Sequence, residues 1–236
     1  MTNADDVRAR FGATAEQFAA HSAAQVDRVR DELTTLVSLR GDERALDSGT
    51  GAGTLAIALA PLVREVVGVD LVAELLAAAR RDAPENVIFV EGDATRLEFD
   101  AFSFDVAASR RTLHHVARPE LVIAELTRLT RPGGMIIVED QIAPADPLIA
   151  VEIDHFERAR DASHTRLLPD ADLRQLFEAN GLVLQTGRRR TESRAVDPYL
   201  DLAGCSGGAR DVAAGLVPGG GDVYVAESAW YVLRRG

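Results

Sequence analysis

The spacing of apolar residues changes along the chain, and each change predicts a different kind of element. Over the first forty residues, apolar side chains recur at helical spacing and form one face of an amphipathic segment: Phe11, Phe18, Val26, Val29, Leu33, Leu36 and Val37. From residue 44 to residue 139, short apolar or β-branched runs alternate with Ala- and Leu-rich stretches of helical period. Such alternation predicts strands that are separated by helices.

Five strands and three helices are expected in this alternating region. The strands span Arg44 to Asp47, Glu65 to Asp70, Val87 to Glu91, Phe104 to Ser109 and Met135 to Glu139. The helices span Thr54 to Ala60, Val72 to Ala83 and Pro119 to Thr130, with prolines placed just after the first two and at the first turn of the third. Strands joined through helices form βαβ units, so the sequence predicts an α/β fold with a parallel sheet and right-handed crossovers.

The last third of the chain has a different pattern. Helices are expected from Pro147 to Ala162, as an insertion, and from Pro169 to Asn180, where Gly181 supplies the stop. Two more strands are expected, from Leu182 to Arg188 and from about Val223 to Leu233. The Gly-rich stretch between these strands is interpreted as a mobile loop. No repeat or linker interrupts the chain, so residues 1–236 are interpreted as a single domain.

Charge limits the classes of partner. The formal net charge is −11, whereas a nucleic-acid groove or an anionic membrane surface needs clustered Lys and Arg. The run Arg188, Arg189 and Arg190 is interpreted as a solvated strand edge. The sequence therefore predicts no nucleic-acid partner and no membrane partner.

Cysteine usage and hydropathy point to an ordinary intracellular protein. Cys205 is the only cysteine, which excludes an intrachain disulfide and a multi-cysteine metal site, and no metal is expected. The first thirty residues are polar and charged, without an apolar core of signal-peptide length. No stretch approaches the ~20 apolar residues of a membrane span. A soluble, cytoplasmic protein is therefore expected.

The chemistry-bearing segment lies between the first expected strand and the first expected helix. Its sequence, ALDSGTGAGTLAIALA, places Asp47, Gly49, Gly51 and Gly53 in a D-x-G-x-G-x-G pattern. Glycines at such a turn allow backbone dihedrals that other residues avoid and let a ligand approach the main chain closely. The helix that follows presents unpaired N–H groups to a carboxylate or a phosphate.

The glycine pattern alone does not distinguish between two classes of ligand. Starting at Gly51, the same segment also matches the G-x-G-x-x-G/A fingerprint of dinucleotide-binding enzymes. Asp70, about 20 residues further on, does not choose either, because a carboxylate at that place binds a ribose diol in both classes. Capping of the next helix is an alternative role for Asp70.

The surrounding residues favour one ligand. Asp47 is unnecessary for a pyrophosphate but suits the ammonium group of an amino acid. Asp93, directly after the third strand, can accept from an adenine amino group while the next backbone N–H meets the ring, and Leu71 offers an apolar face. Asp93 also has a plainer alternative role as a turn cap. Together these positions favour a ligand that joins adenosine to an amino acid, S-adenosylmethionine.

At family level, the chain resembles the class I, Rossmann-like S-adenosylmethionine-dependent methyltransferases. Within them it resembles most the branch that contains the ubiquinone and menaquinone C-methyltransferases. The resemblance rests on the runs ALDSGTGAG, GVDLVAELLAAAR, EGDATRLEFD, FDVAASRRTLHHV and RLTRPGGMIIVED, and it covers about Phe11 to Asp140. The run DHFERARDASHTRLLPDADLRQLFEANGL is also similar to a segment of many members of that branch.

The resemblance implies a doubly wound, mostly parallel sheet of seven strands, of which the last is antiparallel. It also implies a helical N-terminal lid (residues 1–40), a cofactor-binding core (41–140), a helical insertion that covers the acceptor (141–180) and C-terminal strands (181–236). The methionine site carries over to Asp47, Gly49 and Gly51, and the ribose carboxylate to Asp70. Ser48 and Thr50 depart mildly from the family pattern, which usually has an apolar residue there.

The expected cofactor contacts form one set at the strand ends. They are Asp47, Gly49, Thr50, Gly51, Gly53, Asp70, Leu71, Gly92, Asp93, Ala94, Ser109 and Arg110. Leu71, Asp93 and Ala94 would contact the adenine, and Ser109 and Arg110 would lie near the methionyl group. S-adenosylhomocysteine is the expected product form of the cofactor.

The acceptor is expected to be a small molecule, quinone-like or a natural-product intermediate. A general base is needed only where the acceptor loses a proton. Candidates are His115, His155 and His164, with His114 and His21 nearby in the pattern, and His164 is the first choice over His155. The alternative for each histidine is a structural role, in which it caps a helix or hydrogen-bonds to backbone groups of a loop. Apolar walls are expected from Phe11, Phe18, Leu113, Ile142, Phe156 and Tyr199.

Two other functions stay open at this stage. The chain could bind S-adenosylmethionine without methylating anything, or it could be an NAD(P)-dependent reductase that uses the shifted glycine fingerprint. The reductase hypothesis is weakened because the chain contains no Tyr-x-x-x-Lys pair. Protein and nucleic-acid acceptors are disfavoured, because Ser109-Arg110-Arg111-Thr112 replaces an Asn/Asp-Pro-Pro-Tyr type signature after the fourth strand. A homodimer is a possible assembly.

Overall fold

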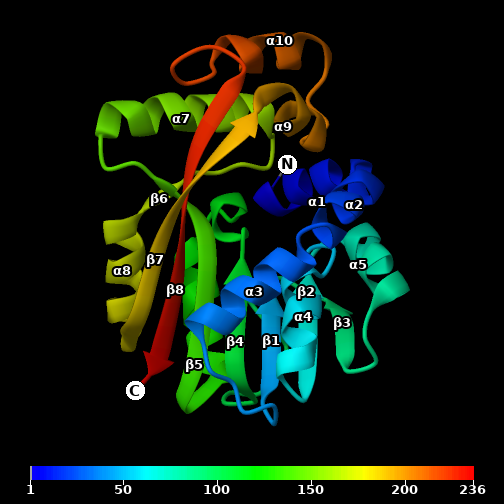
Figure 1. Ribbon diagram of the computed structural model, residues 1–236, viewed down its shortest axis with the longest axis vertical. Coiled ribbons are helices and arrows are strands. Elements are labelled where there is room, and N and C mark those ends of the chain that lie inside the picture. The colour runs from blue at the N-terminus through cyan, green and yellow to red at the C-terminus, as the bar shows by residue number, and fades with distance from the viewer. Residues whose placement is uncertain (1) are drawn as a thin grey trace.

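The sheet runs through the molecule in the order β3-β2-β1-β4-β5-β8-β7, with a short additional strand, β6, paired to the end of β5. The structure is a computed structural model and describes residues 2–236 (Figure 1). The strands are β1 Arg44–Ser48, β2 Glu65–Asp70, β3 Val87–Glu91, β4 Phe104–Arg110, β5 Thr130–Ala143, β6 Leu168–Pro169, β7 Leu182–Ala195 and β8 Val223–Arg235.

Neighbouring strands from β3 to β5 are parallel, whereas β8 is antiparallel to both β5 and β7. The expected doubly wound α/β sheet with an antiparallel last strand is therefore confirmed. In sequence order the chain builds outward from β1 to β3 and then returns to place β4 on the other side of β1. This reversal is the point at which open α/β sheets bind their ligands, at the carboxyl ends of the strands.

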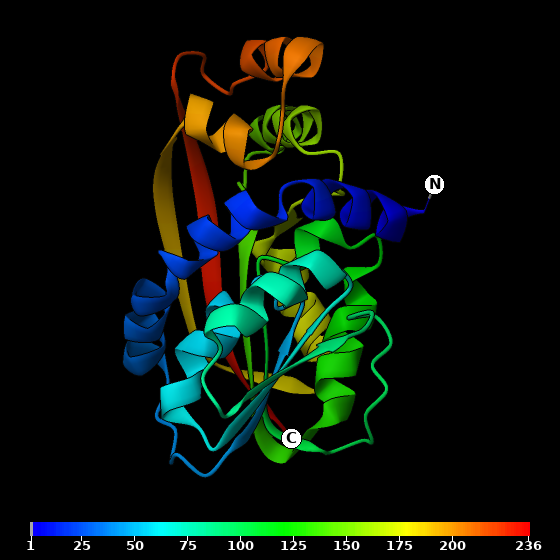
Figure 2. The same ribbon diagram turned by 90° about the vertical axis from the view of Figure 1, so that its right-hand side faces the viewer.

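Helices cover both faces of the sheet (Figures 1 and 2). They are α1 Asn3–Ala13, α2 Ala15–Ala23, α3 Val26–Leu36, α4 Thr54–Leu59, α5 Ala73–Ala79, α6 Pro119–Leu129, α7 Pro147–Arg160, α8 Asp170–Ala179, α9 Val196–Leu202 and α10 Gly207–Gly215. Single 3₁₀ turns follow α4 (Ala60–Leu62), α5 (Arg80–Asp82) and β4 (Leu113–His115). No helix within residues 2–236 combines the length and apolarity that a bilayer crossing requires.

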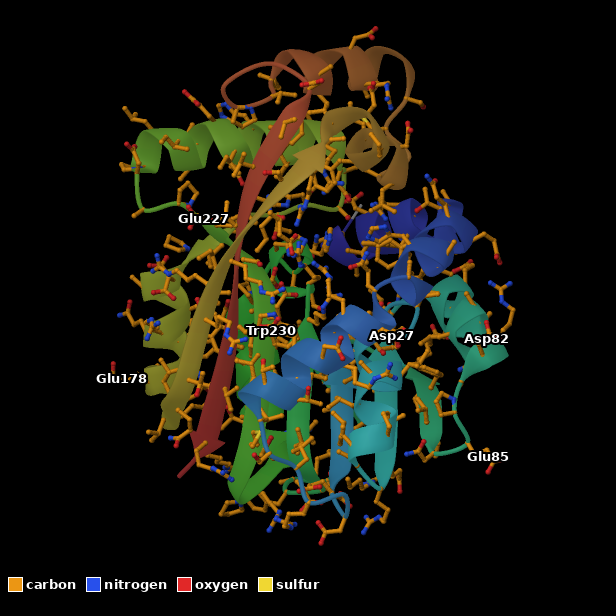
Figure 3. All side chains as sticks on the ribbon, in the orientation of Figure 1. Asp27, Asp82, Glu85, Glu178, Glu227 and Trp230 are labelled. Carbon is orange, nitrogen blue, oxygen red and sulfur yellow. The ribbon has the colours of Figure 1, made fainter. Side chains whose placement is uncertain are left out.

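Two apolar layers hold these helices to the sheet. On one face, α3, α4 and α5 bury residues such as Leu33, Leu55 and Leu76, and Trp230 of β8 lies in the same layer beside α3 (Figure 3). On the other face, α6 and α8 bury a second layer, which includes Ile123. Because these strands are covered on both sides, they read in the sequence as continuous apolar runs rather than as alternating ones.

Strands β5, β7 and β8 are longer than their apolar runs predict. Strand β5 continues to Ala143 and β7 continues to Ala195, because both pair with β8 over its length. The extension of β7 is polar and was therefore not expected from hydrophobicity. It carries the sheet beyond the carboxyl ends of the central strands.

Helices α7, α9 and α10 pack on this extension and form an upper layer above the sheet (Figure 1). Their shared core contains Phe156, Leu200, Ala213 and Tyr224, all nearly or fully inaccessible to solvent. The expectation of a Gly-rich loop between the last strands was therefore wrong for Gly207 and Gly208, which begin α10, whereas Gly204 and residues 219–221 lie outside helices and strands. Helix α10 contains weak helix formers, and it is stabilised by the burial of Ala213 rather than by propensity.

The arginine run on β7 is also more than a solvated edge. Arg188 donates to the Glu32 carboxylate at 2.8 Å, and Arg190 forms an ion pair with the same carboxylate. Glu32 is buried on α3, whereas Arg189 bonds to Asp170 on the other side of the strand. The run therefore fastens α3 and α8 to the extended strand.

Candidate active site

The glycine turn after β1 adopts the backbone that its sequence predicts. Gly49, Gly51 and Gly53 have φ values of 74°, 56° and 87°, in the left-handed region that favours glycine. The N–H groups of Gly49 and Thr50 donate to the Val69 carbonyl at 2.8 and 2.9 Å, so the turn is fixed to the end of β2. Helix α4 begins directly after the turn, at Thr54.

The two glycines nearest β1 have different surroundings. A Cβ on Gly49 would come within 2.3 Å of the Thr112 side chain, so this position is closed by packing. A Cβ on Gly51 would meet only Phe18, at 3.5 Å. Phe18 lines a cavity, and Gly51 therefore presents its backbone to that cavity.

Asp70 ends β2 and holds the turn from the other side. Its Oδ2 accepts the Gly51 N–H at 2.7 Å, and its Oδ1 accepts the Val72 N–H at 3.0 Å. Burial raises the pKa of Asp70, and these backbone donors partly offset the effect. A carboxylate has about four acceptor positions, so two remain for a hydroxyl pair.

Asp47 is fully buried at the end of β1. Its Oδ2 accepts the Thr50 hydroxyl at 2.6 Å, while Oδ1 has no hydrogen-bond partner among residues 2–236. Burial raises the pKa of Asp47 to about 7. An unsatisfied buried carboxylate oxygen is costly, and a cationic ligand group that reaches it would remove that cost.

Both carboxylates lie in the wall of one cavity of about 730 Å³. The N-terminal helices pass over the strand ends and beneath the upper layer, and so cover this region (Figure 2). The cofactor side of the cavity is lined by Asp47, Gly49, Thr50, Gly51, Thr54 and Asp70. The rest of the lining comes from α1, α2, α3, the ends of β4 and β5, α7, β7 and α9: the side chains include Phe11, Phe18, His21, Arg28, Arg110, Arg111, His114, His115, Arg194 and Tyr199.

His115 has a defined tautomer in this wall. Its Nδ1 lies 2.9 Å from Ser163 Oγ, and that hydroxyl donates its only proton to Asp161 Oδ1 at 2.6 Å. Nδ1 must therefore carry the hydrogen and donate to Ser163, which leaves Nε2 with a free lone pair. Burial, followed by the neighbouring His114, lowers the pKa of His115 well below its usual value, so the ring is neutral at pH 7.

His114 supports the same loop. Its Nδ1 is hydrogen-bonded to Asp140 Oδ1, and the other oxygen of Asp140 accepts the backbone N–H of Leu113 at 2.7 Å. Burial would raise the pKa of Asp140, but His114 and Arg111 lower it overall. The expected loop-satisfying role of one histidine of the pair therefore fits His114.

The two histidines favoured from the sequence lie elsewhere. His155 is exposed on α7, outside the cavity wall. His164 is buried behind His114, with ring centroids 5.8 Å apart, and its Nε2 lies 3.4 Å from Asp154 Oδ1. Burial lowers the pKa of His164 to about 4. Neither ring reaches the cavity, because α7 turns one outward and the loop after α7 buries the other.

Several expected cofactor contacts also lie outside the cavity lining. Gly53, Leu71, Gly92, Asp93, Ala94 and Ser109 do not line it, whereas Arg110 does. Asp93 accepts the Thr95 N–H at 2.8 Å, the turn-capping role given above as its alternative. Ser109 is buried and donates to the Ser48 carbonyl at 2.9 Å, so it ties β4 to β1. The adenine contacts of Leu71, Asp93 and Ala94 stay predictions.

Of the six residues expected as apolar walls of the acceptor pocket, some line the cavity and others do not. Phe11, Phe18 and Tyr199 line the cavity. Leu113, Ile142 and Phe156 belong to the packed cores. Sequence reasoning missed Arg28, Arg111 and Arg194, which come from three separate elements and share no local motif. In the structure, the backbone of Arg111 adopts a left-handed φ of 54°, which is unusual for a residue other than glycine.

Comparisons with known proteins agree with this geometry. A family profile described as a methyltransferase domain matches residues 46–138. YcgJ of Bacillus subtilis, named an uncharacterized methyltransferase, is 35% identical over 150 residues, which cover 62% of this chain and 59% of YcgJ. The demethylmenaquinone methyltransferase of Renibacterium salmoninarum is 31% identical over 163 residues, which cover 69% of this chain and 67% of that protein.

The solved structure of YcgJ has the same fold. It superposes with a TM-score of 0.83 at 24% identity, over 89% of this chain and 98% of YcgJ. The sequence match to YcgJ spans about three fifths of that relative's length. The sheet order and the Asp-and-glycine turn define a Rossmann-like methyltransferase fold. The chain belongs to the class I S-adenosylmethionine-dependent methyltransferases.

The residues at the strand ends fit the cofactor of this family. The free Oδ1 of Asp47 suits an ammonium group, and the two remaining acceptor positions of Asp70 suit a ribose diol. Gly51 leaves room for a ligand main chain between them.

Proposed function

We propose that the protein transfers a methyl group from S-adenosylmethionine to a small-molecule acceptor. The observation that carries this proposal is the unpartnered buried oxygen of Asp47, which shares one cavity with Asp70 and the glycine turn. An amino acid joined to adenosine places a cation and a diol where those two carboxylates lie. Asp47 and Gly51 would hold the methionyl end, and Asp70 the ribose.

Asp47 argues against a dinucleotide, whereas Asp70 is compatible with both kinds of ligand. A pyrophosphate at the glycine turn would lie beside the Asp47 carboxylate, and like charges at close range disfavour binding. An NAD(P)-dependent reductase is therefore not favoured.

When bound, S-adenosylmethionine supplies an electrophilic methyl group on a sulfonium. The protein must align the acceptor atom with that methyl group and keep water out. Phe11 and Phe18 pack edge to face, with ring centroids 5.1 Å apart, and close the cavity from the N-terminal side. Residues 1–40 would thus act as the lid, residues 41–140 as the cofactor core, residues 141–180 as the acceptor cover and residues 181–236 as the C-terminal strands.

For an acceptor that loses a proton, we assign the general base to His115. The His115 ring lines the cavity, Ser163 and Asp161 fix its Nδ1–H tautomer, and its Nε2 therefore keeps a lone pair that can accept a proton. As the methyl group bonds to the acceptor atom, the proton of that atom would pass to Nε2. This arrangement suits hydroxyl, amine or acidic carbon acceptors.

A small-molecule partner, and not a nucleic acid, fits the placement of the cations. Arg110 and Arg111 lie inside the cavity wall, where carboxylates neighbour them, rather than on an open face. A cytoplasmic location and a homodimer remain predictions from the sequence.

The test has two arms. Calorimetric titration with S-adenosylhomocysteine and with NADH separates the methyltransferase from the reductase; binding of NADH alone would overturn the proposal. Turnover of methyl-labelled S-adenosylmethionine over a metabolite panel then separates methyl transfer from cofactor binding without catalysis. A chain that binds S-adenosylhomocysteine but methylates nothing would support the non-methylating alternative.

A further inference from the structure

We infer that the methyl acceptor carries an anionic group, a carboxylate or a phosphate, which binds the arginines of α3, β4 and β7 in the cavity wall. This inference rests on the proposed function, because it names the substrate class of the same site. It concerns four side chains that the cofactor site described above does not require as a set: Arg28, Arg110, Arg111 and Arg194.

Within residues 2–236, the ion pairs of these four arginines involve two carboxylates. Glu192 lies 3.3 Å from Arg28, 3.1 Å from Arg111 and 2.9 Å from Arg194. Glu139 pairs with Arg111 at 3.0 Å and with Arg110 at 3.4 Å. Asp47 and Asp140 also act on Arg110 and Arg111 through space, but no ion pair joins them to these arginines, and Asp140 is hydrogen-bonded to His114. One wall of the cavity therefore has a surplus of guanidinium donors over paired carboxylates.

Arg110 is the least satisfied member of this group. Its Nε is buried and has no hydrogen-bond partner among residues 2–236, and its ion pair with Glu139 is longer than the others. A guanidinium presents five N–H donors, so Arg110 has free donors in the cavity wall. An oxyanion can satisfy such donors in a bidentate manner.

The pKa of His21, which also lines the cavity, is lowered by burial and by the nearby arginines. Desolvation lowers the pKa of its imidazole first, and the remaining causes are all arginines: Arg110, Arg194, Arg28 and Arg111. The four guanidinium groups therefore face one shared space rather than four separate surface positions.

The other arginines of the cavity do not contribute to the surplus. Arg10 forms an ion pair with Asp161 at 2.9 Å, and Arg160 donates to Glu157 at 2.8 Å. Each of these two arginines therefore has a carboxylate partner of its own, although Arg160 lies over the same Tyr199 ring as Arg194. The anionic group of the acceptor is accordingly expected at the wall of α3, β4 and β7.

The cofactor does not remove the surplus. S-adenosylmethionine brings one carboxylate, but it also brings an ammonium and a sulfonium, so the cavity gains positive charge when it binds. The neighbouring Phe18 and Tyr199 add aromatic surface. The lining thus fits an organic anion with an apolar or aromatic part.

The experiment uses the whole chain saturated with S-adenosylhomocysteine. Benzoate, phenyl phosphate and the neutral benzyl alcohol are titrated in turn by calorimetry. We expect at least one anion to bind and benzyl alcohol not to bind. Benzoate and phenyl phosphate distinguish a carboxylate-bearing from a phosphate-bearing acceptor.

Variants locate the site. Arg28→Gln and Arg194→Gln should weaken anion binding about tenfold or more. Arg189→Gln is the matched control, because Arg189 lies on the same strand β7 but pairs with Asp170 outside the cavity. Arg28 is half exposed, so its variant tests the inference even if Arg194→Gln fails to fold.

Three results would overturn the inference. They are binding of benzyl alcohol as tight as that of the anions, an equal loss in Arg189→Gln, and no binding of either anion at 100 times the protein concentration. A loss of S-adenosylhomocysteine affinity in both Arg28→Gln and Arg194→Gln would assign these arginines to the cofactor carboxylate instead. Because the chain is already saturated with S-adenosylhomocysteine, these results leave the proposed methyltransferase function standing.

Discussion

The carboxylate of Asp70 accepts the backbone N–H of Gly51 at 2.7 Å. This bond joins the end of β2 to the glycine turn after β1, two strand ends that are neighbours in the sheet. Asp70 therefore shapes the turn whether or not a ligand is bound, and its free acceptor positions point to a second role in binding.

Asp70→Ala should weaken the binding of S-adenosylhomocysteine by about 1.5–3 kcal/mol, because charge-assisted hydrogen bonds to the ribose are lost. It should also lower the free energy of unfolding by about 1–2 kcal/mol, since the Gly51 and Val72 N–H groups lose their acceptor. Calorimetry and urea denaturation measure the two effects. Asp82→Ala, at the outer edge of the molecule (Figure 3), serves as the control. An unchanged dissociation constant would remove Asp70 from the ribose site.

The protonation of Asp47 should couple binding to pH. Burial raises its pKa to about 7 in the free protein, above the unfolded value of about 4. Below pH 7 the folded protein holds a proton that a bound ammonium group must displace. Affinity for S-adenosylhomocysteine should therefore fall by up to about tenfold for each pH unit below 7.

The stability of the free protein should have the opposite dependence on pH. Between about pH 4 and pH 7 the folded state binds more protons at Asp47 than the unfolded state does, so this group lowers stability as pH rises through that window. Asp47→Asn should remove this contribution and weaken binding at pH 8. Thermal unfolding from pH 5 to pH 8 with and without S-adenosylhomocysteine checks both; parallel pH curves for the wild type and Asp47→Asn would contradict the assignment.

His115→Gln should lower the methylation rate by about 10²-fold for an acceptor that loses a proton, with cofactor affinity unchanged. The reason is that His115 lines the cavity and its Nε2 keeps a free lone pair, because its Nδ1 carries the hydrogen. His155→Ala is the surface control and should keep full activity. His164→Ala should reduce stability more than rate, because that ring is buried away from the cavity. Normal turnover of His115→Gln would show that the loop shapes the pocket without supplying a base.

Substitution at the glycine turn should separate folding from binding. Gly51→Val should abolish S-adenosylhomocysteine binding and leave a folded chain, at a cost of about 1–2 kcal/mol for the left-handed backbone. Gly49→Ala should instead destabilise the fold, because its Cβ would overlap Thr112. Circular dichroism melting and calorimetry on both variants provide the comparison. Normal binding by Gly51→Val would make the turn structural only.

The sequence by itself determined the local features of this protein. The alternation of apolar runs with helical stretches predicted the central strands, because strands covered on both faces have a continuous apolar pattern. The glycine spacing after β1 predicted a left-handed turn, and Asp47, Gly51 and Asp70 could be named because each lies at a fixed distance from a strand end.

Only the tertiary structure decided which side chains line the rest of the cavity. The arginines of the proposed acceptor wall come from α3, from the end of β4 and from β7, and no local spacing relates residues that helix packing and the strand order bring together. The choice among the histidines also depended on packing. His114 and His115 both line the cavity, but Asp140 fixes His114 whereas Ser163 fixes His115, and the outer face of α7 exposes His155. Helix α10 packs on α7 and buries Ala213 in their shared core, and its Gly-rich sequence does not reveal this packing.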